Sequence, residues 1–169
     1  MNTSSDLFNE QLVTKESSPK DLAKKVGIIS FAVVLAFAIL ALIPSILLIV
    51  LIIEGLILVF LFRRFNVEYE YILTNYELDI DRIYNKMKRK KGISIDVKRF
   101  SIVVPVLKKE YENELSKVDK VLDFSSGVVK ENTYAAIYTM DGKRIKLIFE
   151  PNEKLLKSIK MYCPSSFKK

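Results

Sequence analysis

The chain has 169 residues and a net charge of +7, which leaves room for one modest soluble domain beside a membrane segment and excludes a large enzyme. It contains no histidine or tryptophan, and Cys163 is its only cysteine, which excludes an intrachain disulfide and a zinc cluster of His and Cys ligands from one copy. Residues 1–25 carry no net charge, whereas residues 63–169 hold 23 basic and 15 acidic side chains. The C-terminal two thirds therefore carry the positive charge.

Residues 26–62 form one apolar run that is interrupted only by Glu54 and by Pro44. As one straight helix the run would be about 55 Å long, against a hydrocarbon core of about 30 Å. Two spans, Val26–Ile43 and Ser45–Phe62, each match that thickness, and Pro44 between them stops one helix before the next begins. The sequence therefore predicts a two-span transmembrane hairpin over residues 26–62, preceded by a flexible cytoplasmic tail over residues 1–25.

The charges around the run predict its orientation. Lys20, Lys24 and Lys25 precede the run, and Arg63 and Arg64 follow it, so the positive-inside rule places both ends in the cytoplasm. This predicts a multi-pass protein of the plasma membrane with cytoplasmic N- and C-termini. The alternative is one tilted, proline-kinked helix, which would put the C-terminal domain outside. The run is also much longer than the apolar core of a signal peptide, so it should remain in the mature protein.

Glu54 would lie near the middle of the second span, where an ionised carboxylate costs about 2.5 to 3.5 kcal/mol on insertion scales. One interpretation is a proton or cation pathway. The other is an interhelical hydrogen bond, including one between protomers. The run contains no second ionisable residue to form a relay, which favours the hydrogen bond.

From Val67 the hydrophobic pattern changes to alternation, which predicts antiparallel strands. Two strands meet at a Thr74-Asn75 turn, a charged turn follows over Lys86–Gly92, and later strands are expected over residues 93–97, 100–106, 118–124, 133–140 and 143–149. Asp141-Gly142 joins the last two, since this pair favours a tight hairpin. A helix opens at Pro151-Asn152-Glu153 and stops at Pro164.

The predicted fold class is α+β. A transmembrane helical hairpin is followed by a small antiparallel β-sandwich or partly open β-barrel over residues 63–163, with a C-terminal capping helix and a basic tail over residues 164–169.

The stretch Tyr71-Ile72-Leu73-Thr74-Asn75-Tyr76-Glu77-Leu78, with the hairpin before it, a basic turn and a Val104-Pro105 strand end after it, resembles bacterial pleckstrin-homology-like membrane proteins. The ending over residues 134–160 is similar to that of an uncharacterised family of small bacterial membrane proteins. The resemblance implies a PH-like fold and a bacterial membrane location. It implies no activity, because fold does not fix function.

The candidate site is a cluster of cations. Near an anionic leaflet each Lys or Arg contributes about 1 kcal/mol, so the cluster could hold the domain against the membrane. The alternative is a solvated hairpin tip. The candidate lipid- or partner-binding residues are Lys86, Lys88, Arg89, Lys90, Lys91, Lys98 and Arg99.

Catalysis is not expected, because the sequence has no histidine base, no GxSxG, no P-loop and no dinucleotide-binding glycine motif. No cofactor and no metal site are predicted. Nucleic-acid binding is disfavoured, since Tyr69 and Tyr71 alternate like core residues and lie in no RNA-binding motif. The favoured function is a membrane-anchored binding or scaffold protein that contacts anionic lipid or a protein partner. The alternative is an accessory subunit that assembles with its own copies or a membrane complex through the hairpin and Glu54.

Overall fold

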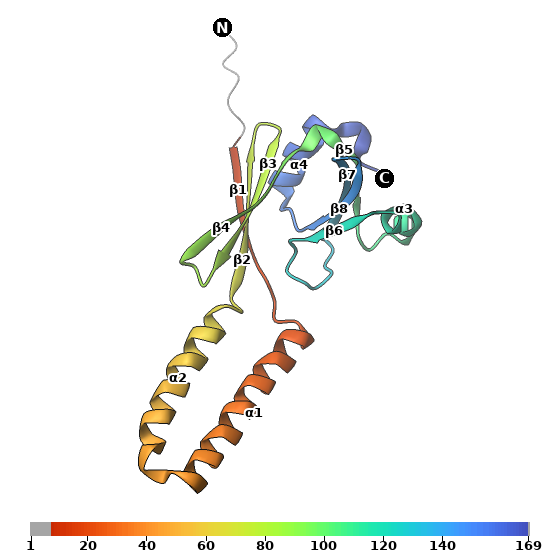
Figure 1. Cartoon of the computed structure of the whole chain (residues 1–169). Coiled ribbons are helices and arrows are strands. Elements are labelled where there is room, and N and C mark those ends of the chain that lie inside the picture. The colour runs from red at the N-terminus through yellow and green to blue at the C-terminus, as the bar shows by residue number, and fades with distance from the viewer. Residues whose placement is uncertain (1–7, 169) are drawn as a thin grey trace.

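The computed structural model describes residues 8–168 and contains two helices beside a domain of two sheets (Figure 1). Helices α1 (Pro19–Leu42) and α2 (Leu47–Arg63) form a hairpin through a 3₁₀ turn at Pro44–Ile46. Both are long and apolar enough to cross a membrane, and neither contains a residue that the rest of the chain buries. Core helices of soluble proteins bury an apolar face, so these helices are candidate membrane spans.

Helix α1 begins before the predicted span. Ser18 and Asp21 form a capping box, in which the Asp21 backbone N–H donates to Ser18 Oγ (3.1 Å), and Pro19 occupies the first turn. At 1.5 Å per residue α1 is about 36 Å long, which exceeds the hydrocarbon thickness of about 30 Å. Its first turns, with Lys20 and Lys24, therefore extend beyond the length that a bilayer core requires.

The first sheet has the order β1-β2-β3-β4, and all of its neighbours are antiparallel. The predicted hairpin of β2 and β3 is confirmed, with Asn75 in its turn at a φ of 54°. The strands are β1 (Phe8–Thr14), β2 (Val67–Thr74), β3 (Glu77–Tyr84) and β4 (Lys88–Asp96).

Strand β1 corrects the prediction for residues 1–25. Those residues were expected to form a flexible tail, but residues 8–14 pair with β2 along their whole length, from Phe8 opposite Thr74 to Thr14 opposite Glu68. Residues 1–7 lie outside the described part of the chain. The helix hairpin is therefore an insertion between two neighbouring strands of one sheet, rather than an anchor placed before the domain.

Two of the three side chains of β1 that face the core are polar, and the third, Val13, is buried in the hydrophobic core. Asn9 Nδ2 donates to Ser158 Oγ (2.7 Å), and Gln11 Nε2 donates to the Glu150 carbonyl (2.7 Å). On the outward face Phe8 is 56% exposed. β1 therefore attaches to the rest of the domain through specific hydrogen bonds as well as through the apolar contact of Val13.

The second sheet has the order β5-β7-β8-β6. The predicted Asp141-Gly142 hairpin is confirmed, with positive φ angles of 51° and 73°. The expected wholly antiparallel arrangement is wrong at one pair, because β6 runs parallel to β8. The strands are β5 (Phe100–Pro105), β6 (Lys120–Asp123), β7 (Tyr134–Met140) and β8 (Lys143–Phe149).

The α+β class is confirmed, but the suggested β-barrel is not formed. Over residues 8–168 no strand ladder joins the two sheets, which remain open. A shared core lies between them, and its largest side chains are aromatic. Tyr71 is completely buried, and its hydroxyl donates to the Phe124 carbonyl (2.7 Å) across the interface. This bond fixes β2 against the end of β6.

Helix α4 (Glu153–Tyr162) packs on this core as predicted. Asn152 caps it by accepting a hydrogen bond from the Leu155 backbone N–H (2.8 Å), and Leu155 and Ile159 are buried. A shorter helix, α3 (Glu112–Ser116), precedes β6. The predicted basic tail over residues 164–169 is partly structured, because a 3₁₀ turn at Pro164–Ser166 brings Phe167 into a bridge with Val103 of β5.

Candidate functional site

The basic segment Lys86–Lys91 is divided between a turn and a strand. Asn85 and Lys86 adopt positive φ angles of 50° and 55°, and the Met87 backbone N–H donates to the Tyr84 carbonyl (3.1 Å). Lys88 begins β4, so the predicted charged turn over Lys86–Gly92 is too long. The true turn is residues 85–87, and the remaining cations lie on an edge strand.

The strand register places this turn beside the end of the helix hairpin. Helix α2 ends at Arg63, and β2 begins at Val67, which pairs with Tyr84 at the end of β3. Tyr84 also pairs with Lys88 at the start of β4. The β3–β4 turn therefore lies at the end of the sheet nearest the helices, as Figure 1 shows.

A cavity of about 510 Å³ separates the end of α2 from the β3–β4 turn. Two arginines of the helix and two lysines of β4 line it, together with apolar groups that are 58% and 81% exposed, those of Phe60 and Met87. The Arg64 guanidinium lies over the Phe60 ring, 5.0 Å from its centroid. Within residues 8–168 none of the four cations forms an ion pair. The lining residues are Phe60, Arg63, Arg64, Tyr84, Asn85, Met87, Lys88 and Lys90.

Lys98 and Arg99 lie at the opposite end of β4. They belong to a 3₁₀ turn that follows Asp96, which pairs with Glu77 at the start of β3. Since each strand residue advances about 3.3 Å, this turn is roughly 25 Å from the β3–β4 turn. Lys98 Nζ lies 3.7 Å from the centroid of the Tyr76 ring. The predicted set of cations therefore does not form a single surface.

Arg89 is occupied by an internal contact. Its guanidinium forms an ion pair with Glu70, whose side chain is only 5% exposed on the outward face of the first sheet. Burial raises the pKa of Glu70, the positive charge of Arg89 opposes that rise, and the neighbouring Glu10 adds to it. Lys91 is exposed beside this pair at an irregularity of the ladder. Arg89 therefore has a structural role that its neighbours Lys88 and Lys90 do not share.

Lysines at the start of α1 extend the basic surface. Lys25 Nζ lies 5.3 Å from the centroid of the Phe65 ring, which brings the start of α1 beside the end of α2. Sequence reasoning used these lysines for topology only and missed that they join the strand cations. We define the basic rim as the cations where the helices meet the sheet domain: Lys20, Lys24, Lys25, Arg63, Arg64, Lys86, Lys88 and Lys90.

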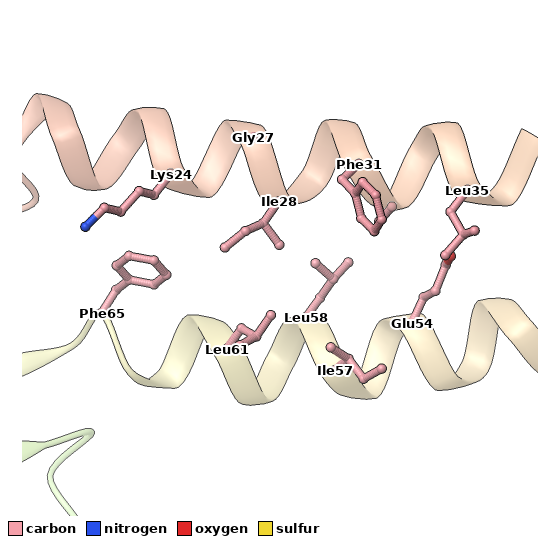
Figure 2. Close-up of a pocket in the computed structure, with 11 residues that line it drawn as sticks. Lys24, Gly27, Ile28, Phe31, Leu35, Glu54, Ile57, Leu58, Leu61 and Phe65 are labelled. Carbon is pink, nitrogen blue, oxygen red and sulfur yellow. The ribbon is translucent and has the colours of Figure 1, made fainter.

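A second space, of about 550 Å³, lies between α1 and α2 (Figure 2). Its walls are almost entirely apolar, with Lys24 at one end and Glu54 toward the other. Glu54 Oε1 is shielded from solvent, and no described residue donates a hydrogen bond to it. The carboxyl therefore faces Leu35 across the hairpin without a partner within the described chain.

The described residues around these two sites include no metal-binding cluster and no reactive cysteine. Over residues 8–168 no group of three His, Cys, Asp or Glu side chains is close enough to hold a metal ion. Cys163 is 4% exposed, and burial raises the pKa of its thiol to about 11, so it is a protonated core residue at neutral pH.

Two packed sheets with a C-terminal helix, and a basic end beside an apolar helix hairpin, define a PH-like domain of a membrane-associated protein. The chain belongs to the bacterial PH-like domain family DUF6106, whose family model matches residues 5–169. The match begins before the helices, in agreement with β1 as part of the domain. Comparison with curated proteins and with solved structures gives no match.

Proposed function

We propose that the protein is a non-catalytic binding module anchored in the bacterial plasma membrane, with its PH-like domain held against the anionic inner leaflet by the basic rim. The observation that carries this proposal is the register of the first sheet. It sets Lys88 and Lys90 beside Arg63 and Arg64 at the end of α2, where the helices would leave the bilayer.

The pairing of β1 with β2 supports two spans with both ends on one side. These strands precede and follow the helix hairpin, and neighbouring strands must share a compartment. A single kinked span would separate them. If α1 were cleaved off as a signal sequence, β1 would be removed with it. Ser158 and Glu150 would then lose their hydrogen bonds to β1. The lysines and arginines at both ends favour the cytoplasmic side.

The charges of the rim support contact with lipid more than with a nucleic acid. A basic residue near an anionic membrane surface contributes about 1 kcal/mol, and this attraction fades within a Debye length of about 8 to 10 Å. If the helices cross the bilayer, Arg63 and Arg64 lie within that distance because they end α2, and Lys88 and Lys90 lie within it because they line the same cavity. Lys98 and Arg99, roughly 25 Å farther out by strand length, are beyond it. Contact with lipid would orient the domain, since the helices already attach it.

A fluorescent reporter at the turn tests the orientation. Met87→Cys in the full chain, labelled with an environment-sensitive dye and placed in nanodiscs, should show bluer emission with anionic than with zwitterionic lipid. K86Q/K88Q should reduce the difference, whereas the matched pair K98Q/R99Q at the far end of β4 should not. Equal emission in both lipids, or equal effects of the two pairs, would contradict the proposal.

Glu54 favours a second candidate, an accessory subunit that assembles through the helix hairpin. An unpaired carboxyl between apolar helices gains from a hydrogen bond to another chain, by about 1 kcal/mol in membrane proteins. Glu54→Leu should then reduce the oligomer size or the partners retained in mild detergent, and Glu54→Gln should retain most of them. Identical profiles for the unmodified chain and Glu54→Leu would remove this candidate.

A further inference from the structure

We infer that the cavity between α2 and the β3–β4 turn binds the headgroup of one anionic phospholipid. This inference rests on the proposed function but goes beyond it, because the basic rim needs only a diffuse anionic surface, whereas the cavity defines a site of one-to-one stoichiometry.

The size of the cavity suits a ligand of this class. Its volume of about 510 Å³ falls within the range of about 300 to 1,000 Å³ that is usual for small-molecule sites. Its walls come from two separate elements, the last turn of α2 and the start of β4. The site therefore exists only where the helix and the sheet meet.

The charges of the lining select an anion. Arg63 and Arg64 approach from the helix, and Lys88 and Lys90 approach from the strand. Within residues 8–168 no carboxylate pairs with any of these four, so their charges are available to a ligand. Arginine and lysine are the side chains that recognise phosphate oxygens. An ethanolamine or choline headgroup would bring a positive charge into the same cluster, so anionic headgroups are preferred.

The apolar part of the lining selects a lipid over a free anion. Phe60 lies one turn of helix, about 6 Å, before Arg64, on the side of the hydrocarbon. It is 58% exposed, and Met87 is 81% exposed across the cavity. Cations at one end and apolar groups toward the membrane match the order of phosphate, glycerol and acyl chain in a phospholipid. Tyr84 and Asn85 add polar groups beside the cations.

Mass spectrometry of the intact full chain, released from mild detergent after equilibration with phosphatidylglycerol and phosphatidylcholine, tests the site. We expect one retained phosphatidylglycerol per chain. R64Q/K88Q should weaken this retention roughly 30-fold, the effect of two charges at about 1 kcal/mol each. The matched control K20Q/K24Q removes two rim cations that do not line the cavity and should retain the lipid. Thermal unfolding of the variants in zwitterionic nanodiscs verifies their folding.

Three outcomes would overturn the inference. If R64Q/K88Q and K20Q/K24Q weaken retention equally, or if no lipid is retained, the attraction is diffuse and the discrete site is wrong, while the proposed function stands. If inorganic phosphate stabilises the chain in zwitterionic nanodiscs as strongly as phosphatidylglycerol does, the ligand is free phosphate. A Met87→Cys reporter with the same emission in anionic and zwitterionic lipid would contradict the site as well as the proposed function, because Met87 lines the cavity.

Discussion

Glu70 is a buried carboxyl on the outward face of the first sheet, where most strand residues of a half-exposed sheet meet water. Its side chain is 5% exposed, with Arg89 as its ion-pair partner and Glu10 nearby on β1. Burial raises its pKa above the ordinary 4.5, so the folded chain holds the proton more tightly than the unfolded chain does. The stability from this group is fully present below pH 4.5 and is lost as the pH rises through the folded pKa.

Glu70→Gln should therefore stabilise the protein at neutral pH. The amide keeps the shape of the side chain and removes both the desolvated charge and the repulsion from Glu10. We expect the melting temperature to rise by about 2 to 4 °C at pH 7, the shift that about 1 kcal/mol produces in a chain of this size, and by less at pH 4.5. Thermal unfolding in detergent at both pH values measures this. A lower melting temperature at pH 7 would mean that the ion pair with Arg89 outweighs the cost of desolvation.

Gly92 is the one glycine whose missing side chain the fold requires for space. A Cβ at this position would lie 2.2 Å from the Ile80 carbonyl oxygen, across the irregular pairing of β3 and β4. Gly92→Ala should force the strands apart and lower the free energy of unfolding by about 1 to 3 kcal/mol. Chemical denaturation measures the loss, and Ser94→Ala on the exposed face of β4 is the control. Equal stability of the two variants would show that β4 adjusts freely at this point.

At the scale of elements, β1 connects the helix hairpin to the domain. It pairs with β2 along seven residues, and its Asn9 and Gln11 reach α4 and the end of β8 through hydrogen bonds. Deletion of residues 1–14 removes β1 and keeps Ser18, whose side chain caps α1. We expect the melting temperature to fall by roughly 10 °C or more, which corresponds to about 3 kcal/mol, because buried partners such as Ser158 lose their hydrogen bonds.

Deletion of residues 1–7 provides the matched control for β1, because it shortens the chain at the same end and keeps Phe8–Thr14. This shorter deletion should leave the melting temperature within about 1 °C. Limited proteolysis gives a second readout, since the edge of β2 becomes exposed only in the longer deletion. If both deletions behave alike, β1 contributes little to the domain, and the original view of residues 1–25 as a tail would be restored.

The sequence predicted those elements whose secondary structure is indicated by a few adjacent residues. The alternation in Val67–Tyr71, the Asp141-Gly142 turn and the cap of α4 at Asn152 each depend on a few adjacent residues. Strand β1 has a weaker signal, because two of its three core-facing positions, Asn9 and Gln11, are polar and its outward positions include Phe8. Those polar residues are tolerated only through partners far along the chain, which a local pattern does not reveal.

The candidate site was predictable in composition but not in arrangement. A run of cations at residues 86–91 is evident from charge alone, yet alternation along β4 directs Arg89 to Glu70 and leaves Lys88 and Lys90 at the cavity. The approach of Arg63 and Arg64 follows from pairing between Val67 and Tyr84, and thus from register. Register is fixed by the whole set of side chains in a sheet, so it could not be deduced from the charged segment itself.

For the whole molecule, the insertion of the hairpin between β1 and β2 makes membrane topology a consequence of the fold. Both strands must lie on one side, and the turn at Pro44–Ile46 must lie on the other if the helices cross the bilayer. The serines Ser17, Ser45 and Ser94 are exposed before α1, in that turn and on β4, respectively. Each provides a position at which a cysteine reports its compartment.

We expect Ser45→Cys to react with a membrane-impermeant maleimide in intact cells, and Ser17→Cys and Ser94→Cys to react only after permeabilisation. Thiolates are the reactive form, so the buried Cys163, with a thiol pKa of about 11, should give little background. The unmodified chain measures that background, and labelling after permeabilisation shows that every variant is present. Labelling of Ser94→Cys in intact cells would place the domain outside. Labelling of Ser17→Cys and Ser94→Cys on opposite sides would separate β1 from β2, which the pairing of these strands does not permit.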